Sequence, residues 1–217
     1  MSNDAIKVLF DTDIGSDIDD AVALAYLVAQ PRCELVGITT VSGQPIERAK
    51  LASAICKTAG ADIPIIPGHE RRLDGATRQP DVPQMSVLPN WEHDTHFSDE
   101  GAVAFMAETI RKNPNEVTLL AVGPMTNVAR LFNEHPDTAE LLRSLHMMIG
   151  RFSTSEHLPV SEWNAHCDPA AADVAYSTAA PGHTSIGLDV THQVVMDSKQ
   201  VKKHFQHPVL KPVYEMS

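Results

Sequence analysis

The chain has 217 residues, of which 43% are hydrophobic and 21% charged, and these proportions are typical of a globular domain with a large core. Twenty-eight acidic residues against 17 basic ones give a formal charge of −11. This charge argues against nucleic acid or an anionic membrane as a partner, because both attract positive protein surfaces. No apolar run reaches the roughly 20 residues that a transmembrane helix needs.

The N-terminal residues and the cysteines bear on the cellular compartment. Residues 1–5 lack the basic and then apolar profile of a secretory signal. The three cysteines, Cys33, Cys56 and Cys167, are widely and irregularly spaced, which favours reduced thiols and does not match a zinc motif. We therefore expect a cytoplasmic protein.

The first part of the chain alternates short apolar runs with helical segments. Strands are predicted for three such runs, at residues 7–10, 35–41 and 63–66. Helices are predicted between them, at residues 19–29 and 46–59. The first helix stops before Pro31 and the second at Gly60. Residues 68–98 show no periodicity, and an unstructured stretch of that length is often functional.

The alternation resumes after this long stretch. Helices are predicted at residues 102–112, 126–133 and 169–177, and strands at residues 117–122, 145–149 and 184–188. Thr126 or its neighbour is the expected N-cap of the middle helix. Repeated β-α-β units imply an α/β fold with a mostly parallel central sheet flanked by helices and a Rossmann-like core. Since no linker or repeat divides the chain, residues 1–217 are predicted to form a single domain.

The residues that follow the first strand are unusually acidic. We call residues 11–20 the acidic loop; its carboxylates are Asp11, Asp13, Asp17, Asp19 and Asp20. Without a counter-charge they would repel one another strongly. A divalent cation is the natural compensation, and oxygen ligands suit calcium or magnesium. The alternative is that these acids serve as helix-end and solvated surface charge.

Three motif families compete for the acidic loop. An EF-hand needs glycine at its sixth position and glutamate at its twelfth, whereas Gly15 comes one place early and Val22 occupies the twelfth. The start of a haloacid-dehalogenase phosphatase fits Asp11 and Asp13 but not Gly15. Residues 10–21 instead resemble the N-terminal signature of the inosine-uridine preferring nucleoside hydrolases, which normally reads Asp-Thr-Asp-Pro-Gly-x-Asp-Asp-Ala.

Further motifs extend this resemblance along nearly the whole chain. They are Ile-Thr-Thr-Val-Ser-Gly-Gln from residue 38, Ile-Pro-Ile-Ile-Pro-Gly from residue 63, Val-Thr-Leu-Leu-Ala-Val-Gly-Pro-Met-Thr-Asn from residue 117 and Val-Ser-Glu-Trp-Asn-Ala-His-Cys-Asp-Pro from residue 160. The resemblance implies a nucleoside hydrolase-like fold. It also implies calcium-dependent hydrolysis of the N-glycosidic bond of a small nucleoside or related N-riboside, in an assembly of two or four copies.

The resemblance implies a calcium site built around the acidic loop. Asp13 would be a calcium ligand and the general base for the attacking water, Asp20 a bidentate ligand, and the carbonyl of Val122 a backbone ligand. The acidic loop has two more residues than the family signature, and Asp17 keeps the family's spacing from Asp13. We favour the pair Asp19 and Asp20, because the apolar helix follows it as in the family.

The resemblance assigns six residues to the substrate: Asp19, Gln44, Glu156, Glu162, Trp163 and Asn164. Three of them depart from the family pattern, since Trp163 replaces phenylalanine, while Gln44 and Glu156 stand where asparagine is usual. Carboxylates around the ribose would stabilise the positive charge that builds up as the glycosidic bond breaks.

The family's distal His-Asp pair has no counterpart between Asn164 and Ser217, so the resemblance implies a chain that is short at its C-terminal end. His192 is an alternative acid, although it follows a different strand. The missing pair and Glu156 motivate a second hypothesis, a homologue that binds nucleoside or ribose without turnover. A third is a phosphatase with Asp11 as its nucleophile.

Two residues near the predicted site receive structural interpretations. Asn127 is interpreted as a helix-start residue rather than a ligand. Cys167 is interpreted as a buried, inert thiol, because no neighbouring base pattern marks it as a nucleophile.

Overall fold

The computed structural model describes residues 5–217, and its centre is a sheet of six parallel strands in the order β3-β2-β1-β4-β5-β6. The strands are β1 (Ile6–Thr12), β2 (Cys33–Thr40), β3 (Ile65–Pro67), β4 (Val117–Ala121), β5 (Ser144–Met148) and β6 (Thr184–Ile186). The chain builds outward from β1 to β3 and then continues on the other side of β1 with β4. This reversal opens a crevice at the carboxyl ends of β1 and β4, where ligands bind in such folds.

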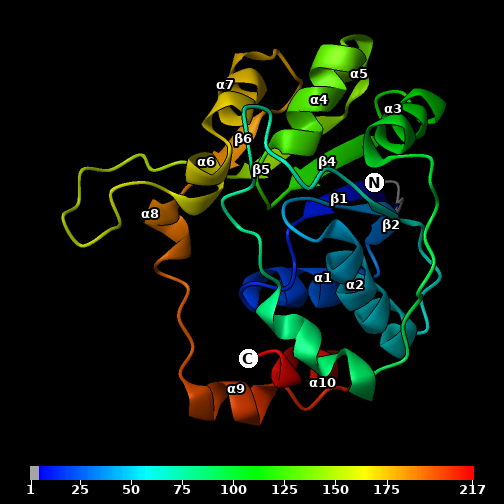
Figure 1. Ribbon diagram of the computed structural model, residues 1–217, viewed down its shortest axis with the longest axis vertical. Helices are drawn as coiled ribbons and strands as arrows, with labels where there is room; N and C mark the ends of the chain where they lie inside the picture. The colour runs from blue at the N-terminus through cyan, green and yellow to red at the C-terminus, as the bar shows by residue number, and fades with distance from the viewer. Residues whose placement is uncertain (1–4) are drawn as a thin grey trace.

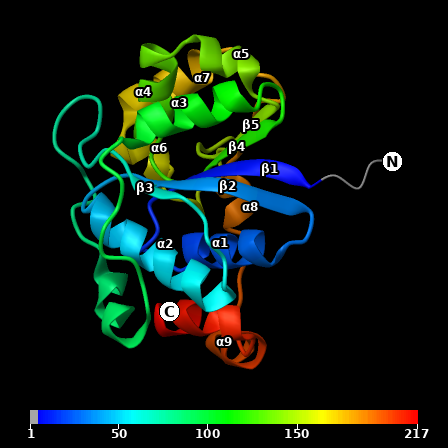
Figure 2. The ribbon, with the colours of Figure 1, turned by 90° about the vertical axis from the view of Figure 1, so that its right-hand side faces the viewer.

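Helices cover both faces of the sheet (Figures 1 and 2). One face carries α1 (Asp19–Ala29) and α2 (Pro45–Ala59); the other carries α3 (Ala102–Lys112), α4 (Thr126–Glu134), α5 (Asp137–Leu141) and α7 (Pro169–Ser177). Successive β1 side chains point to opposite faces, so Leu9 joins the core under α3 and α4 while Phe10 joins the core under α1 and α2. The α/β prediction with a mostly parallel sheet is confirmed.

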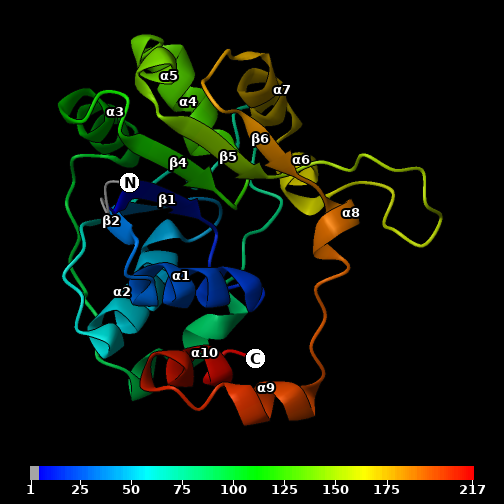
Figure 3. The ribbon, with the colours of Figure 1, turned by 180° about the vertical axis from the view of Figure 1, so that it is seen from behind.

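The remaining elements are short: η1 (Pro83–Asn90), α6 (Trp163–Cys167), α8 (Leu188–Thr191), α9 (Ser198–His204), η2 (Pro208–Leu210) and α10 (Lys211–Glu215). Figure 3 shows the chain leaving α8 and crossing to the α1 and α2 side of the sheet. There Val209, Val213 and Met216 enter the same core as α1 and α2. None of the helices in residues 5–217 is both long enough and apolar enough to cross a bilayer.

Three predicted helices, at residues 19–29, 102–112 and 169–177, have the bounds that the structure shows. The last strand ends at Ile186 instead of residue 188, because α8 begins at Leu188. The stretch predicted to lack structure contains η1, which buries Val87 and Leu88 and whose Gln84 N donates to Gly15 O at 3.1 Å. Apolar residues at irregular spacing hid this element from a search for periodicity.

Candidate active site

A cavity of about 590 Å³ lies at the carboxyl ends of β1, β4 and β5. Its walls contain seven of the residues predicted for the site: Asp13, Asp19, Asp20, Val122, Glu162, Trp163 and Asn164. They come from the acidic loop, from the end of β4 and from α6 with its preceding residue. The crevice that the strand order creates is therefore where the polar residues converge.

Thr12 shapes the acidic loop. Its hydroxyl donates to Asp20 Oδ1 at 2.7 Å and accepts from Ile14 N at 3.0 Å. One side chain at the end of β1 thus binds both the next turn and the first turn of α1. This contact brings Asp20 back toward Asp13, which is only 5% exposed.

The carboxylates of the acidic loop raise one another's pKa values. Burial is the main cause for Asp13, and the charge of Asp19 adds to the rise there. Asp19 is exposed at the cavity rim, and its own pKa is raised first by partial desolvation and then by the charge of Asp17. The pKa of Asp20 is raised well above its usual value by burial and then by the charges of Asp13 and Asp19. A cation bound among these groups would relieve both costs.

Arg48 on α2 supplies the positive charge nearest to these acids, and sequence reasoning missed it. Its side chain is fully buried and donates to Gly43 O at 2.8 Å, Ile14 O at 3.1 Å and Asp81 O at 3.3 Å, and also to Asp13 O. One guanidinium therefore joins the acidic loop to the β2–α2 turn and to the long loop before η1. Arg48 lies on the same helix face as the apolar residues Leu51 and Ile55. A charged residue at an apolar position of a helix is the signal in the sequence that could have indicated a buried, functional arginine.

The end of β4 approaches the acidic loop closely. Val122 N donates to Asp11 O at 2.8 Å, and the Val122 carbonyl accepts from Asn164 Nδ2 at 2.7 Å. A Cβ atom at Gly123 would lie 2.8 Å from Asp13 N and 2.9 Å from Asp13 Oδ1. Only glycine at position 123 therefore lets β4 deliver a backbone carbonyl beside Asp13.

Glu162 precedes α6 and caps it. Its Oε1 accepts from Asn164 N at 2.7 Å, and its Oε2 accepts from Ala165 N at 2.9 Å and Gly150 N at 3.1 Å. A carboxylate oxygen can accept a further bond, so the cap leaves capacity for a ligand. The Asn164 amide is held by the carbonyls of Val122 and Met148, and both side chains are therefore fixed before any substrate binds.

Trp163 is 51% exposed and forms one wall of the cavity. Its Nε1 donates to Gln79 Oε1 at 3.0 Å, and its ring stacks on His166 with centroids 5.6 Å apart. Gln79 also lines the cavity but was not predicted, because it lies in the long aperiodic stretch. His192, the residue that follows α8, also lines the cavity.

Two predicted substrate residues lie outside the cavity walls. Gln44 has a left-handed backbone (φ 55°) at the start of α2, and its side chain donates to Pro80 O at 2.9 Å. Glu156 is exposed in residues 151–161, which we call the projecting loop because it extends away from the body between β5 and α6 (Figure 1). Asp17, the alternative to the Asp19 and Asp20 pair, is exposed at the cavity edge.

Asp11 lies beneath the acidic loop and is fully buried. Its Oδ1 accepts from Thr39 Oγ1 at 2.5 Å and from Asn127 Nδ2 at 2.8 Å, and burial raises its pKa to about 7. A nucleophile must be reached by its substrate, so this burial argues against the phosphatase hypothesis. Asn127 lies at the start of α4, as interpreted, and also holds Asp11 and accepts from His69 N.

Cys167 is buried at the end of α6. Burial raises the pKa of its thiol to about 12, which disfavours the thiolate that a nucleophile requires. The interpretation of a buried, inert thiol agrees with this environment.

The donors around Asp13 fit a hard cation. Two carboxylates, Asp13 and Asp20, and the Val122 carbonyl supply only oxygen, as calcium prefers. Within residues 5–217 no three or more His, Cys, Asp or Glu side chains are arranged as a metal cluster. Asp13, Asp20 and the Val122 carbonyl stay the predicted ligands of a calcium ion.

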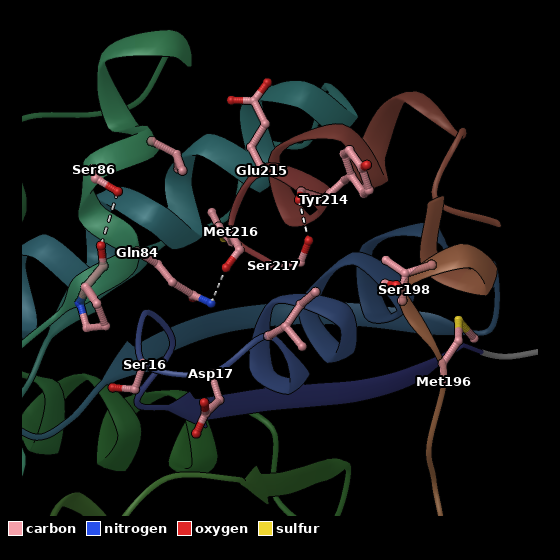
Figure 4. Close-up of a pocket in the computed structure, with 14 residues that line it drawn as sticks. Ser16, Asp17, Gln84, Ser86, Met196, Ser198, Tyr214, Glu215, Met216 and Ser217 are labelled. Carbon is pink, nitrogen blue, oxygen red and sulfur yellow. Dashed lines mark hydrogen bonds between the residues drawn. The ribbon is translucent and has the colours of Figure 1, made fainter. Parts of the chain in front are cut away.

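A second cavity, of about 720 Å³, lies between η1, α9 and α10 (Figure 4). Ser16 and Asp17 line both cavities. Gln84 crosses the second cavity and donates to Met216 O at 2.8 Å. The walls of this second cavity contain none of the residues assigned to calcium or ribose. The first cavity, of about 590 Å³, is therefore the candidate site.

Comparison with known proteins points to one family. The sequence model described as inosine-uridine preferring nucleoside hydrolase matches residues 8–216. An uncharacterized protein of Schizosaccharomyces pombe is 32% identical over 213 residues, covering 91% of this chain and 66% of the relative. The pyrimidine-specific ribonucleoside hydrolase RihA of Citrobacter koseri is 30% identical over 218 residues, covering 92% and 65%. The chain thus spans about two thirds of the length of these curated relatives.

Solved structures agree with this comparison. The plant nucleoside hydrolase PpNRh1 superposes with a TM-score of 0.82 at 26% identity, covering 98% of this chain and 70% of that chain. The purine-preferring ribonucleoside hydrolase of Gardnerella vaginalis has a TM-score of 0.81 at 25% identity, covering 97% and 70%. The effector protein XOO4466 has a TM-score of 0.79 at 19% identity and shares the fold.

Proposed function

We propose, from the premise that this chain belongs to the inosine-uridine preferring nucleoside hydrolase family, that its site hydrolyses the N-glycosidic bond of ribonucleosides with the help of calcium. The observation that carries the proposal is the meeting of Asp13, Asp20, the Val122 carbonyl, Glu162 and Asn164 around one cavity. Because the relatives are longer than this chain, the activity of the whole protein is part of the proposal.

Asp13, Asp20 and the Val122 carbonyl would hold the calcium ion. Bound there, the ion would offset the repulsion among the acids and lower the pKa of a water molecule. Gly123 and Thr12 serve this arrangement, since one admits the β4 carbonyl and the other fixes Asp20. The same three oxygens would leave coordination positions for water and ribose hydroxyls, because calcium takes roughly six to eight ligands.

Asp13 would accept the proton of the attacking water. The water oxygen bonds to the anomeric carbon of ribose while the bond from that carbon to the base nitrogen breaks. Positive charge builds up on the ribose during this step, and the carboxylates of Glu162 and Asp19 would stabilise it. Glu162 is pre-oriented by three backbone N–H groups, which reduces the reorganisation needed in the transition state.

The departing base takes up a proton at the nitrogen that leaves the ribose. His192, the residue that follows α8, lines the cavity and is our candidate donor. Trp163 and Leu188 supply apolar wall beside the polar floor, as the face of a base requires.

The proposal is tested by measuring ribose release from a panel of purine and pyrimidine ribonucleosides. We expect release with calcium, its loss with a chelator, and its return when calcium is added back. Glu156→Gln serves as a matched acidic control outside the cavity and should retain activity. No release from any ribonucleoside at saturating calcium would contradict the proposal.

The second hypothesis, a binding homologue without turnover, uses the same cavity. It is favoured by the position of Glu156, which is exposed and does not line the cavity although the resemblance assigns it to the substrate. Calorimetry separates the two, since this hypothesis expects calcium-dependent nucleoside binding with no ribose release.

A cytoplasmic location and an assembly of two or four copies stay predictions. Light scattering measures the number of copies in the assembly.

A further inference from the structure

The eight lysines of this chain divide into two groups of four. Every lysine of the first group forms an ion pair: Lys7 with Glu116, Lys50 with Glu47, Lys57 with Asp94 and Lys112 with Glu108. The second group consists of Lys199, Lys202, Lys203 and Lys211, which are all exposed. Within residues 5–217 none of these four forms an ion pair. A molecule with a formal charge of −11 therefore carries one patch of unpaired positive charge.

The carboxylates nearest to this patch in sequence are bound elsewhere. Beyond Met196 the chain has two acidic residues, Asp197 and Glu215. Asp197 caps α9, and its Oδ1 accepts from Lys199 N at 2.9 Å. Glu215 Oε2 accepts from Trp91 Nε1 at 3.0 Å. Both carboxylates thus serve the fold, and neither forms an ion pair with a lysine side chain.

The helix α9 turns three of these lysines outward. Val201 lines the second cavity, and Phe205, one turn later, packs against the core under α1 and α2. Lys199 and Lys203 come two residues before and after Val201, which places them on the opposite side of the helix, and Lys202 flanks them. We call these three lysines the basic face. Like charges at such spacings repel one another, so an anionic partner would stabilise α9.

An exposed apolar segment leads directly into α9. We call residues 192–197 the strap, and Figure 3 shows it along the outside of the molecule between α8 and α9. Val194 is 82% exposed, Val195 83% and Met196 51%. Three consecutive exposed apolar residues are unfavourable in water unless they serve a contact. Because the capping box of Asp197 fixes the start of α9 next to Met196, the strap and the basic face form one surface.

The two parts of this surface together select the kind of partner. Lysines beside exposed apolar side chains are the pattern that binds an anionic bilayer. There the lysines meet lipid headgroups, and the apolar groups enter the boundary with the acyl chains. Nucleic acid or a free phosphate would engage the lysines alone and leave the strap in water.

The acidic character of the whole molecule does not prevent this contact. The formal charge of −11 argues against an anionic partner for the surface as a whole. At physiological ionic strength, however, exposed charges separated by more than about 8 Å are largely screened from one another. Figure 1 shows α9 at the edge of the molecule, on the side of α1 and α2 that faces away from the sheet. The charge that a lipid surface meets there is that of the basic face.

We propose that the basic face and the strap dock on an anionic lipid surface. The lysines contact the headgroups, and the apolar side chains of the strap enter the boundary between headgroups and acyl chains. The contact is peripheral, since the chain lies on the bilayer without crossing it. This docking does not rest on the proposed hydrolase activity, and its tests need no substrate.

Co-sedimentation with vesicles tests the proposal. We expect the protein to bind vesicles of equal parts phosphatidylcholine and phosphatidylserine at physiological ionic strength, to be released by high salt, and to stay in solution with phosphatidylcholine alone. The double variant Lys202→Gln/Lys203→Gln should bind roughly thirtyfold more weakly, because each lysine near such a surface contributes a factor of about five. Absence of binding to the anionic vesicles, or binding that the double variant leaves unchanged, would overturn the proposal.

A variant of equal charge separates the basic face from the net charge. Lys57→Gln/Lys112→Gln removes two charges from lysines that are ion-paired on α2 and α3. It should bind the anionic vesicles as the wild type does. Equal weakening in the two double variants would show that net charge governs the binding and would overturn the role of the basic face.

Tryptophan fluorescence tests the strap. Val195→Trp places an indole on the strap at a position that lines neither cavity. Compared with the wild type, which contains Trp91 and Trp163, the emission of this variant should shift to shorter wavelength when anionic vesicles are added. An unshifted emission from protein that sediments with the vesicles would overturn the entry of the strap into the lipid.

Two measurements distinguish lipid from other partners. Duplex DNA offers phosphates without an apolar interior, so it should bind far more weakly than the anionic vesicles. Light scattering without lipid should give the same mass for the wild type and for Lys202→Gln/Lys203→Gln. DNA binding as tight as vesicle binding would assign the basic face to polyanions in general, and a lower mass of the variant would assign it to a second copy of this chain. Either result would overturn the lipid proposal.

Discussion

Two loops beside the site cavity are each organised by one arginine, but only one of these arginines is buried. Arg48 is fully buried and joins the acidic loop to the β2–α2 turn and the long loop. Arg151 donates to carbonyls of the projecting loop itself, including Ser155 O at 2.6 Å and Pro159 O at 2.8 Å. The acidic loop is therefore fixed by the rest of the molecule, whereas the projecting loop is fixed mainly by itself.

This difference shows where a sequence motif predicts the position of a side chain. Asp13 and Asp20 lie in the loop that several segments constrain, and both reach the cavity. Glu156 lies in the projecting loop, where Phe152 is 64% exposed and Val160 94% exposed, and it does not. A spacing in sequence places a side chain only when tertiary contacts leave its loop one conformation.

The largest expected effect compares the two loops through one acid in each. Asp13→Asn should lower kcat for ribonucleoside hydrolysis by roughly a thousandfold, because it removes the proposed general base, which is also a proposed calcium ligand. Glu156→Gln should change kcat less than about threefold, as expected of an exposed side chain remote from the chemistry. Steady-state kinetics at saturating calcium measures both. Comparable losses in the two variants would erase the distinction between the loops.

The next effect compares the two arginines. Arg48→Met keeps much of the side-chain volume but leaves several buried carbonyls without a donor, and should lower the free energy of unfolding by about 3 kcal/mol. Arg151→Met should cost about 0.5 kcal/mol, since water can replace its donors. Urea unfolding followed by circular dichroism measures both. If Arg151→Met proved as costly as Arg48→Met, the projecting loop would be part of the cooperative core.

A smaller effect concerns the hydroxyl groups within each loop. Thr12→Val removes the donor to Asp20 with little change of shape, and should weaken calcium binding about tenfold, the equivalent of about 1.4 kcal/mol. Ser155→Ala is the matched change in the projecting loop and should leave calcium affinity within about twofold of the wild type. Calorimetric titration decides, and an unchanged affinity in Thr12→Val would remove Asp20 from the proposed ligands.

The smallest effect concerns the link between the projecting loop and α8. Asp189 Oδ2 accepts from Phe152 N at 2.6 Å, and a side-chain hydrogen bond from Ser153 followed by this backbone bond lowers the pKa of Asp189 to about 2. A carboxyl whose folded pKa is depressed stabilises the folded contact above its unfolded pKa of about 3.9, and this contribution is lost as the pH falls toward 2. After correction for the intrinsic pH dependence of amide exchange, we expect the Phe152 amide to exchange faster as the pH falls across that window. In Asp189→Asn the same amide should exchange fast at every pH. A corrected exchange rate that does not change with pH in the wild type would contradict the link.

Local pattern was sufficient for the longer elements. The helices at residues 19–29 and 102–112 have apolar faces and clear ends, so their bounds could be predicted. By contrast α8 has four residues, α9 seven and α10 five, which is too short for a helical period to be seen. Of these helices α10 packs on α1 and α2, and α8 contacts β6, and the local sequence encodes neither contact.

The site was predictable where a motif is contiguous and not where residues are isolated. Asp13, Glu162 and Asn164 belong to short runs with a recognisable pattern, and they line the cavity. Gln79 carries no pattern at all, because its place in the site comes from the Trp163 indole and the Ser16 hydroxyl that bind its side chain.

The sequence by itself determined the β-α-β alternation, the parallel sheet and the position of the acidic loop after the first strand, because each depends on periodicity or on neighbouring residues. The tertiary structure alone decided which polar groups meet. Asn127 donates to Asp11 across 116 residues of sequence, Gln79 meets Trp163 across 84, and Asn164 meets Val122 across 42. Contacts of this kind, and the burial that raises the pKa of Asp11, arise only when distant segments exclude water together, and no local pattern records that.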